Sequence, residues 1–137
     1  MNILLLYPMF SMVLLTFVVA CFAVKVRFAS VKNKTVSAKY FRLMDGQQVP
    51  EVITKTTRNF NNQFEIPTLF YVVCTLYVCL GIHSITVLSF AWAFVAFRIA
   101  HTYIHLTYNH ILHRMVTFWL SFVCVMVLWV NLLLHNI

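Results

Sequence analysis

The chain has 137 residues, of which 62% are hydrophobic and 9% are charged, and its formal net charge is +7. Because an average soluble domain has about 25% charged residues, this composition excludes an ordinary soluble protein and predicts one that lies in a membrane. We attribute the positive charge to membrane topology and contact with anionic lipid. No nucleic-acid partner is expected, since the basic loop is short.

The first apolar stretch covers residues 3–24 and contains no charged side chain. A transmembrane helix needs about 20 apolar residues, so this stretch is long enough to cross a bilayer by itself. It lacks the positively charged leading segment of a signal peptide, and we therefore expect a retained span. Pro8 falls in the first turns, where a proline is tolerated.

A polar segment over residues 25–57 follows, and we expect it to be a cytoplasmic loop. Between Lys25 and Arg58 the sequence has eight lysines and arginines against Asp45 and Glu51. Positively charged connections stay on the cytoplasmic side of a membrane. The connection before the last apolar stretch is also basic, so a chain with four spans would have both termini on the outer side.

Further apolar stretches complete the chain. They predict spans over about 58–82, 85–106 and 115–134. The helix of the second span should begin at Glu51 and continue past Pro67, because neighbouring helices can replace the hydrogen bond that a proline removes. The sequence therefore predicts an all-α, multi-pass integral membrane protein: a four-transmembrane-helix bundle that forms a single domain over residues 1–137.

Two sets of polar side chains repeat at helical spacing in these stretches. The first is Arg58, Asn62 and Glu65, and the second is Arg98, His101 and His105. Each set falls on one face of a helix. An ionisable group at membrane depth costs about 2.5–3.5 kcal/mol on insertion scales, so it normally faces the protein interior or a polar cavity. We therefore predict that both sets line a buried site, with Glu65 paired to Arg98.

The joint spacing of these residues points to a known family. The motifs are Arg58-(x)3-Asn62-(x)2-Glu65, then Arg98-(x)2-His101, and then Arg114. They resemble the MAPEG family, the membrane-associated proteins of eicosanoid and glutathione metabolism, and the resemblance covers nearly the whole chain. Residues 62–67 and 98–109 look most like a bacterial-type branch, which would place the protein in the cell inner membrane.

The resemblance implies a homotrimer that binds glutathione as a co-substrate between neighbouring subunits, near the cytoplasmic face. Arg114 would be the catalytic residue that faces the thiol. The residues implied in substrate binding are Arg58, Asn62, Glu65, Arg98, His101, His105 and Tyr108. His105 stands where glutathione-using members commonly have a tyrosine, a role that Tyr108 could take. Phe60 and Asn61 stand where those members commonly have a histidine and an arginine.

These residues support one leading function and two alternatives. The leading function is an integral membrane glutathione-dependent transferase or peroxidase that activates the thiol as a thiolate and acts on lipophilic small molecules that are electrophiles. The departures at Phe60, Asn61 and His105 leave open a non-catalytic membrane trimer or lipid-binding scaffold with an altered pocket. A histidine-ligated metalloenzyme is less favoured, and no metal is expected, because Arg98 and Arg114 would repel a cation.

Overall fold

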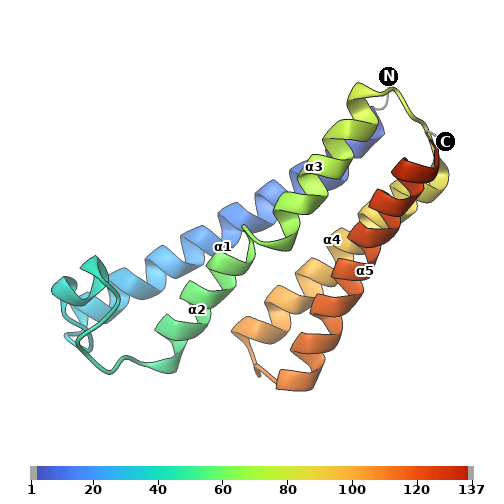
Figure 1. The fold of residues 1–137 in the computed structure, drawn as a ribbon. Helices are drawn as coiled ribbons and strands as arrows, with labels where there is room; N and C mark the ends of the chain where they lie inside the picture. Colours follow the sequence, from blue (N-terminus) through green and yellow to red (C-terminus); the bar gives the residue numbers. More distant parts are fainter. Residues whose placement is uncertain (1–2, 136–137) are drawn as a thin grey trace.

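The computed structural model describes residues 3–135, and every regular element within them is helical. In chain order the elements are the 3-10 helix η1 (Ile3–Leu5), α1 (Leu6–Lys32), the 3-10 helix η2 (Ala38–Arg42), α2 (Glu51–Asn62), α3 (Ile66–Cys79), α4 (Ile85–Leu106) and α5 (Ile111–His135). The all-α prediction is therefore confirmed for the described residues. In the bundle, α4 lies along α5 and α1 lies along α2 (Figure 1).

The start of α1 and the end of α5 lie at the same end of the bundle (Figure 1). The two termini themselves, at residues 1–2 and 136–137, lie outside the described residues. Their predicted place on the outer side of the membrane thus stays a prediction.

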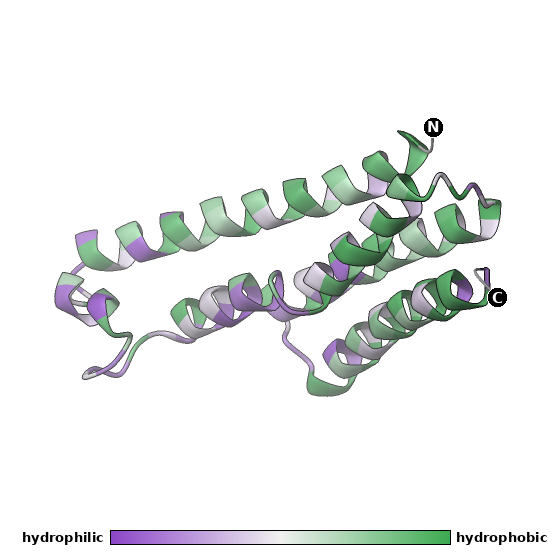
Figure 2. Cartoon of the chain, turned by 45° about the horizontal axis from the view of Figure 1, so that its top comes forward, coloured by the Kyte–Doolittle hydropathy of each residue, from purple (hydrophilic) through white to green (hydrophobic). Residues whose placement is uncertain are grey.

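Among residues 3–135, three helical stretches are long and apolar enough to cross a membrane: Ile3–Lys32, Ile85–Leu106 and Ile111–His135. They contain the first, third and fourth of the predicted spans. Hydrophobic residues cover most of their length (Figure 2), and large side chains such as Phe10 and Phe17 are exposed on α1. Because a soluble protein rarely exposes so extended an apolar surface, these helices fit an integral membrane protein that contacts lipid.

The second predicted span is not one helix. α2 ends at Asn62 and α3 begins at Ile66, and their lengths of 12 and 14 residues leave neither long enough to cross a membrane alone. Between them Glu65 has φ −87° and ψ −101°, outside the helical region. Pro67 explains the break, because it has no N–H to offer the carbonyl of Gln63 and its ring would clash with that carbonyl in a continuous helix. The predicted uninterrupted passage through Pro67 was therefore wrong.

An apolar core holds α3 against α4 and α5. Phe70 of α3 stacks on Phe94 of α4 with ring centroids 4.2 Å apart, and both side chains are fully buried. The Tyr77 hydroxyl donates to the backbone carbonyl of Leu128 at 2.9 Å and lies equally close to Asn131 Oδ1. This core fills the half of the bundle that contains α3, whereas α2 contributes polar side chains to the other half.

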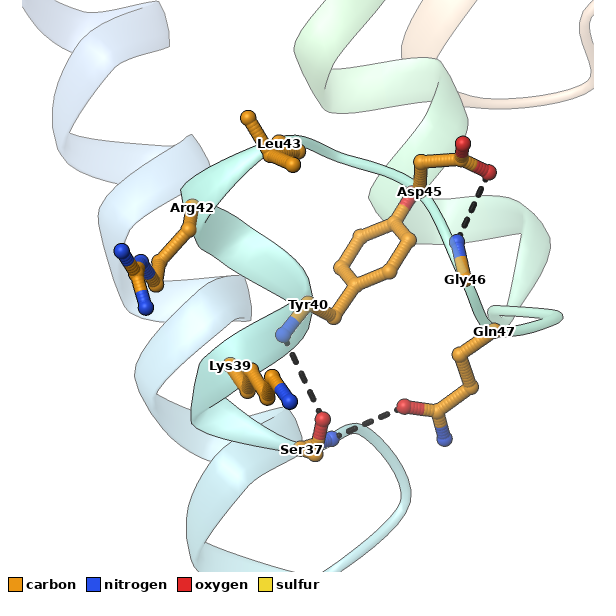
Figure 3. Close-up of a pocket in the computed structure, with 8 residues that line it drawn as sticks. All are labelled: Ser37, Lys39, Tyr40, Arg42, Leu43, Asp45, Gly46 and Gln47. Carbon is orange, nitrogen blue, oxygen red and sulfur yellow. Dashed lines mark hydrogen bonds between the residues drawn. The ribbon is translucent and has the colours of Figure 1, made fainter.

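The loop between α1 and α2 has a defined structure of its own (Figure 3). The Ser37 N–H donates to Gln47 Oε1 at 3.1 Å, and the Gly46 N–H donates to Asp45 Oδ1 at 2.7 Å. Gly46 has φ +86°, a left-handed conformation that glycine adopts without a steric cost. The loop surrounds a hollow of about 660 Å³ and lies at the opposite end of the bundle from the start of α1 (Figure 1).

Candidate functional site

The polar set of the third predicted span lies inside the bundle. Arg98, His101 and His105 are all buried, with relative exposures of 0%, 2% and 2%. They lie on one face of α4 because residues three and four apart on a helix share a face. The rings of His101 and His105 are 5.9 Å apart between centroids. The interior position predicted for this set is thus observed.

The polar set of the second predicted span is not buried. Asn62 is half-buried, and Arg58 and Glu65 are exposed. Glu65 lies in the non-helical link, so it no longer shares a helical face with the other two residues. The buried polar side chains of this region are instead Thr56, Asn59 and Gln63. Arg58 and Glu65 therefore do not lie in the interior of the single subunit, and their predicted position at a seam between subunits stays a prediction.

Arg98 also has a different partner from the one predicted. Its Nη2 donates to the backbone carbonyl of Asn62 at 2.8 Å, and the one ion pair found among residues 3–135 joins Lys55 to Glu51 at 3.0 Å. The last carbonyls of a helix have no intrahelical donor, and the negative end of the helix dipole favours a cation there. Because α2 ends at Asn62, it offers such a carbonyl. Glu65 makes no direct ion pair with Arg98, although its charge still acts on the guanidinium through space.

His101 connects α4 to the start of α5. Its Nδ1 lies 3.0 Å from the backbone carbonyl of Arg114 and 3.4 Å from Thr117 Oγ1. A carbonyl oxygen can only accept a hydrogen bond, so Nδ1 is the donor. The Thr117 hydroxyl donates within α5, to the carbonyls of His113 and Arg114 at 3.0 and 3.1 Å. These contacts fix the orientation of the His101 ring.

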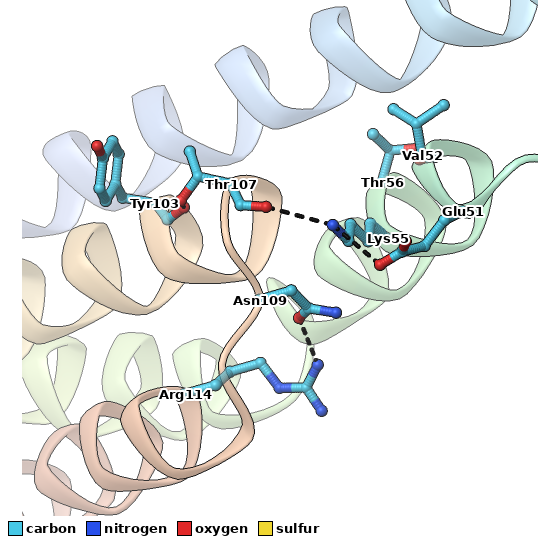
Figure 4. A network of polar contacts seen from close by, with 8 residues as sticks. All are labelled: Glu51, Val52, Lys55, Thr56, Tyr103, Thr107, Asn109 and Arg114. Atoms are coloured by element: carbon cyan, nitrogen blue, oxygen red, sulfur yellow. Dashed lines mark hydrogen bonds and ion pairs between the residues drawn. The ribbon is translucent and has the colours of Figure 1, made fainter.

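Arg114 lies in the first turn of α5, at the turn that follows α4. Its Nη1 donates to Asn109 Oδ1 at 2.8 Å (Figure 4). Asn109 has φ +50°, a left-handed conformation that asparagine adopts more readily than most residues. Lys55 reaches the same region from α2 and donates to the carbonyl of Thr107 at 3.2 Å (Figure 4). Two hydrogen bonds therefore connect the turn after α4 to the first turns of α2 and α5.

A groove of about 390 Å³ opens beside these contacts. It is lined by Asn62, His101, Ile111, Arg114, Met115, Phe118 and Trp119. One wall is polar and comes from three helices, whereas α5 supplies an apolar wall. Three of the predicted site residues line this groove, and the other five do not: Arg58, Glu65, Arg98, His105 and Tyr108. Tyr108 is exposed and its hydroxyl lies 3.1 Å from His113 Nδ1.

Sequence reasoning missed a buried amide network that joins the end of α2 to α4. Gln63 Nε2 donates to Thr102 Oγ1 at 3.2 Å and to Asn59 Oδ1 at 3.3 Å, and all three residues are buried. The spacing of Asn59 and Gln63 by one helical turn was the available signal. Within the described part of the chain, several buried polar atoms nearby have no hydrogen-bond partner: Asn59 Nδ2, Gln63 Oε1, Arg98 Nε and Nη1, His101 Nε2 and His105 Nδ1.

Unpartnered buried polar atoms each cost about 1–3 kcal/mol, so this region favours a polar ligand. Residues 3–135 contain no group of three or more His, Cys, Asp and Glu side chains that could hold a metal ion. The site therefore combines buried hydrogen-bond donors and a guanidinium with an apolar wall.

Comparison with known proteins agrees with this architecture. No curated protein matches the chain significantly. The family comparison matches residues 5–134, which include every element from α1 to α4 and nearly all of α5. An all-helical bundle with three membrane-length helices and this match over most of its length leads to one conclusion: the chain belongs to the MAPEG family.

Proposed function

We propose that the protein is an integral membrane glutathione-dependent transferase or peroxidase that acts on lipophilic electrophiles. The observation that carries this proposal is the groove in which Arg114 and His101 face an apolar wall. Glutathione brings a thiol and two carboxylates, which need cations and hydrogen-bond donors. A lipophilic electrophile needs the opposite surroundings, and the groove offers both.

Arg114 is the residue that we assign to thiolate activation. A cysteine thiol has a pKa near 8.5, and only the thiolate reacts as a nucleophile. A nearby guanidinium lowers that pKa by favouring the anion. Arg114 uses its Nη1 for Asn109, and a guanidinium has further N–H groups that can donate to the sulfur. Asn109 would thereby hold the guanidinium in place while the other face contacts the ligand.

The apolar wall offers a route from the membrane. Ile111 and Trp119 are both more than half exposed on α5, a helix that is apolar enough to span the bilayer. In the membrane these side chains would contact acyl chains, so a lipophilic substrate could pass from the lipid to Arg114 without crossing water. A lipophilic small molecule is therefore the expected second substrate.

The assembly that we propose is a homotrimer with glutathione bound between neighbouring subunits. Arg58 and Glu65 support it, because they are exposed on the single subunit although charged groups near a membrane segment normally find partners. A neighbouring subunit would supply them. The basic loop after α1 would be cytoplasmic and both termini outside, in the inner membrane if the protein is bacterial.

One observation favours the non-catalytic alternative. Phe60 stands where the resemblance implies a histidine in glutathione-using members, and its ring packs edge to face against Phe64 with centroids 5.1 Å apart. Arg58 and Glu65 also lie away from the groove. A trimer that binds lipid in the same groove without glutathione chemistry would fit these features, and it is the second candidate.

Replacing Arg114 separates the two functions. In purified protein, added glutathione should produce thiolate absorbance in the ultraviolet and turnover of chlorodinitrobenzene or a lipid hydroperoxide. Arg114→Leu should keep the assembly and lower turnover by about 100- to 1,000-fold, as expected when one donor to a developing anion is lost. Arg114→Lys should be intermediate, because the charge remains without the planar fork.

The matched control is Arg42→Leu, which removes an exposed arginine in η2 and should leave turnover unchanged. A wild-type protein that neither binds glutathione nor shows a thiolate signal would exclude the enzyme and leave the lipid-binding scaffold.

A further inference from the structure

The hydrogen bonds of His101 determine which of its ring nitrogens can act as a base. Nδ1 donates to the carbonyl of Arg114 at 3.0 Å and therefore carries a hydrogen. A neutral imidazole has only one N–H, so its other nitrogen, Nε2, carries the lone pair. In the neutral ring, the contact with α5 thus leaves Nε2 as a proton acceptor.

The Nε2 atom is not used by the protein itself. It is buried and has no hydrogen-bond partner among residues 3–135, although the His101 side chain lines the groove beside Arg114. Buried polar atoms are nearly always partnered in native structures. An unused acceptor on a residue that lines the same groove as Arg114 is therefore an unexplained feature of the site.

We infer that His101 Nε2 is the general base that removes the thiol proton from the substrate in the groove. This inference rests on the proposed function and adds a second catalytic residue to it. Arg114 stabilises the anion that forms, and His101 takes the proton. The two roles are distinct because a guanidinium is always protonated and cannot accept a proton.

The proton transfer conserves atoms and charge. The S–H bond of the thiol breaks, its electron pair stays on sulfur, and a new N–H bond forms at Nε2, which turns the imidazole into an imidazolium beside the thiolate. The thiolate then attacks the electrophile. With chlorodinitrobenzene, a C–S bond forms, chloride leaves, and the imidazolium returns its proton to water.

The charged and titratable groups around His101 come from two helices. Arg98 and His105 on α4 and Arg114 on α5 interact electrostatically with its ring. On α2, the groove residue is Asn62, which does not titrate. None of the three neighbours is a carboxylate, and all three disfavour a positive charge on His101. The anion that balances the imidazolium must therefore be the thiolate that forms in the groove.

The test follows thiolate formation by stopped-flow absorbance after mixing with glutathione. His101→Asn keeps a donor for the Arg114 carbonyl and removes the base, so the rate should fall by about 100-fold or more. Added imidazole should raise the rate of His101→Ala in proportion to its concentration and leave the wild type unchanged. His110→Asn, the same change at an exposed histidine outside the groove, should not alter the rate.

The wild type provides a readout that does not depend on folding of the variants. Its rate of thiolate formation should rise with pH and reach a plateau once the imidazole is neutral. A rate that climbs tenfold per pH unit without a plateau would mean that hydroxide takes the proton, and would overturn the inference. Equal rates in wild type and His101→Asn would overturn it too, as would a slow His101→Ala that imidazole fails to rescue.

The same data separate this inference from the proposed function. A wild-type protein without any thiolate signal would exclude the glutathione enzyme and the base together. A thiolate signal that survives unchanged in His101→Asn would leave the enzyme intact and remove only the role of His101.

Discussion

The two halves of the bundle share α4 but follow different physical rules, because α3 completes an apolar core in one half and α2 contributes buried polar side chains to the other. α4 passes through both halves: its first part places Ala91 and Phe94 in the apolar core, and its second part places Arg98 and His101 among polar groups. In the apolar half the buried side chains pack against one another. In the polar half several nitrogens are buried without a partner. The apolar half therefore stabilises the fold, and the polar half is available for a ligand.

The largest effect on stability should come from the apolar half. Phe94→Ala removes a ring that is fully buried and stacked on Phe70, and truncation of a buried phenylalanine typically costs about 3–5 kcal/mol. Unfolding of the detergent-solubilised protein by heat or denaturant measures this loss. The control Phe17→Ala removes an exposed ring from α1 and should change stability little. Equal losses at both positions would show that α3 and α4 do not form the stabilising core.

A smaller loss is expected from Arg98→Met in the polar half. The substitution removes the bond to the Asn62 carbonyl, and a hydrogen bond to a charged group contributes about 1.5–3 kcal/mol. It also relieves the burial of two unpartnered nitrogens, so the net loss should lie below that of Phe94→Ala. The free energy of glutathione binding, measured by calorimetry, should weaken by more than the free energy of unfolding does. If Arg98→Met binds glutathione normally but unfolds easily, the polar half would serve stability and not ligand binding.

The smallest effect should be the coupling between Glu65 and Arg98. Glu65 is exposed and Arg98 bonds the Asn62 carbonyl instead, so the stability losses of Glu65→Gln and Arg98→Met should add within about 0.5 kcal/mol in the double variant. A double-mutant cycle on unfolding free energies gives this number directly. A coupling of several kcal/mol would restore the ion pair that sequence spacing predicts.

The sequence could predict the features that depend on one helix at a time. Long apolar stretches indicate membrane helices, and the spacing of Arg98, His101 and His105 indicates one buried face. The break after α2 was harder to predict, because a membrane helix can often continue past a proline such as Pro67. Once the helix breaks, Glu65 is exposed in the link, and Arg98 donates to the Asn62 carbonyl instead of forming a direct ion pair with Glu65.

Hydrogen bonds from side chains to main-chain carbonyls also could not be predicted from the sequence. The charges in the sequence pair Arg98 with Glu65, but the observed acceptor is a main-chain carbonyl that every residue possesses. The apolar wall of the groove was hidden for a related reason. Met115, Phe118 and Trp119 line the groove, yet in the sequence they cannot be told apart from side chains that only contact lipid.

Asn62 has a consequence for how the family can diverge. Its backbone carbonyl holds Arg98, whereas its side chain lines the groove. The first contact is independent of the amino acid at this position, and the second depends on it entirely. A substitution at position 62 can therefore change the lining of the proposed binding groove without removing the backbone contact to the arginine that joins the two helices.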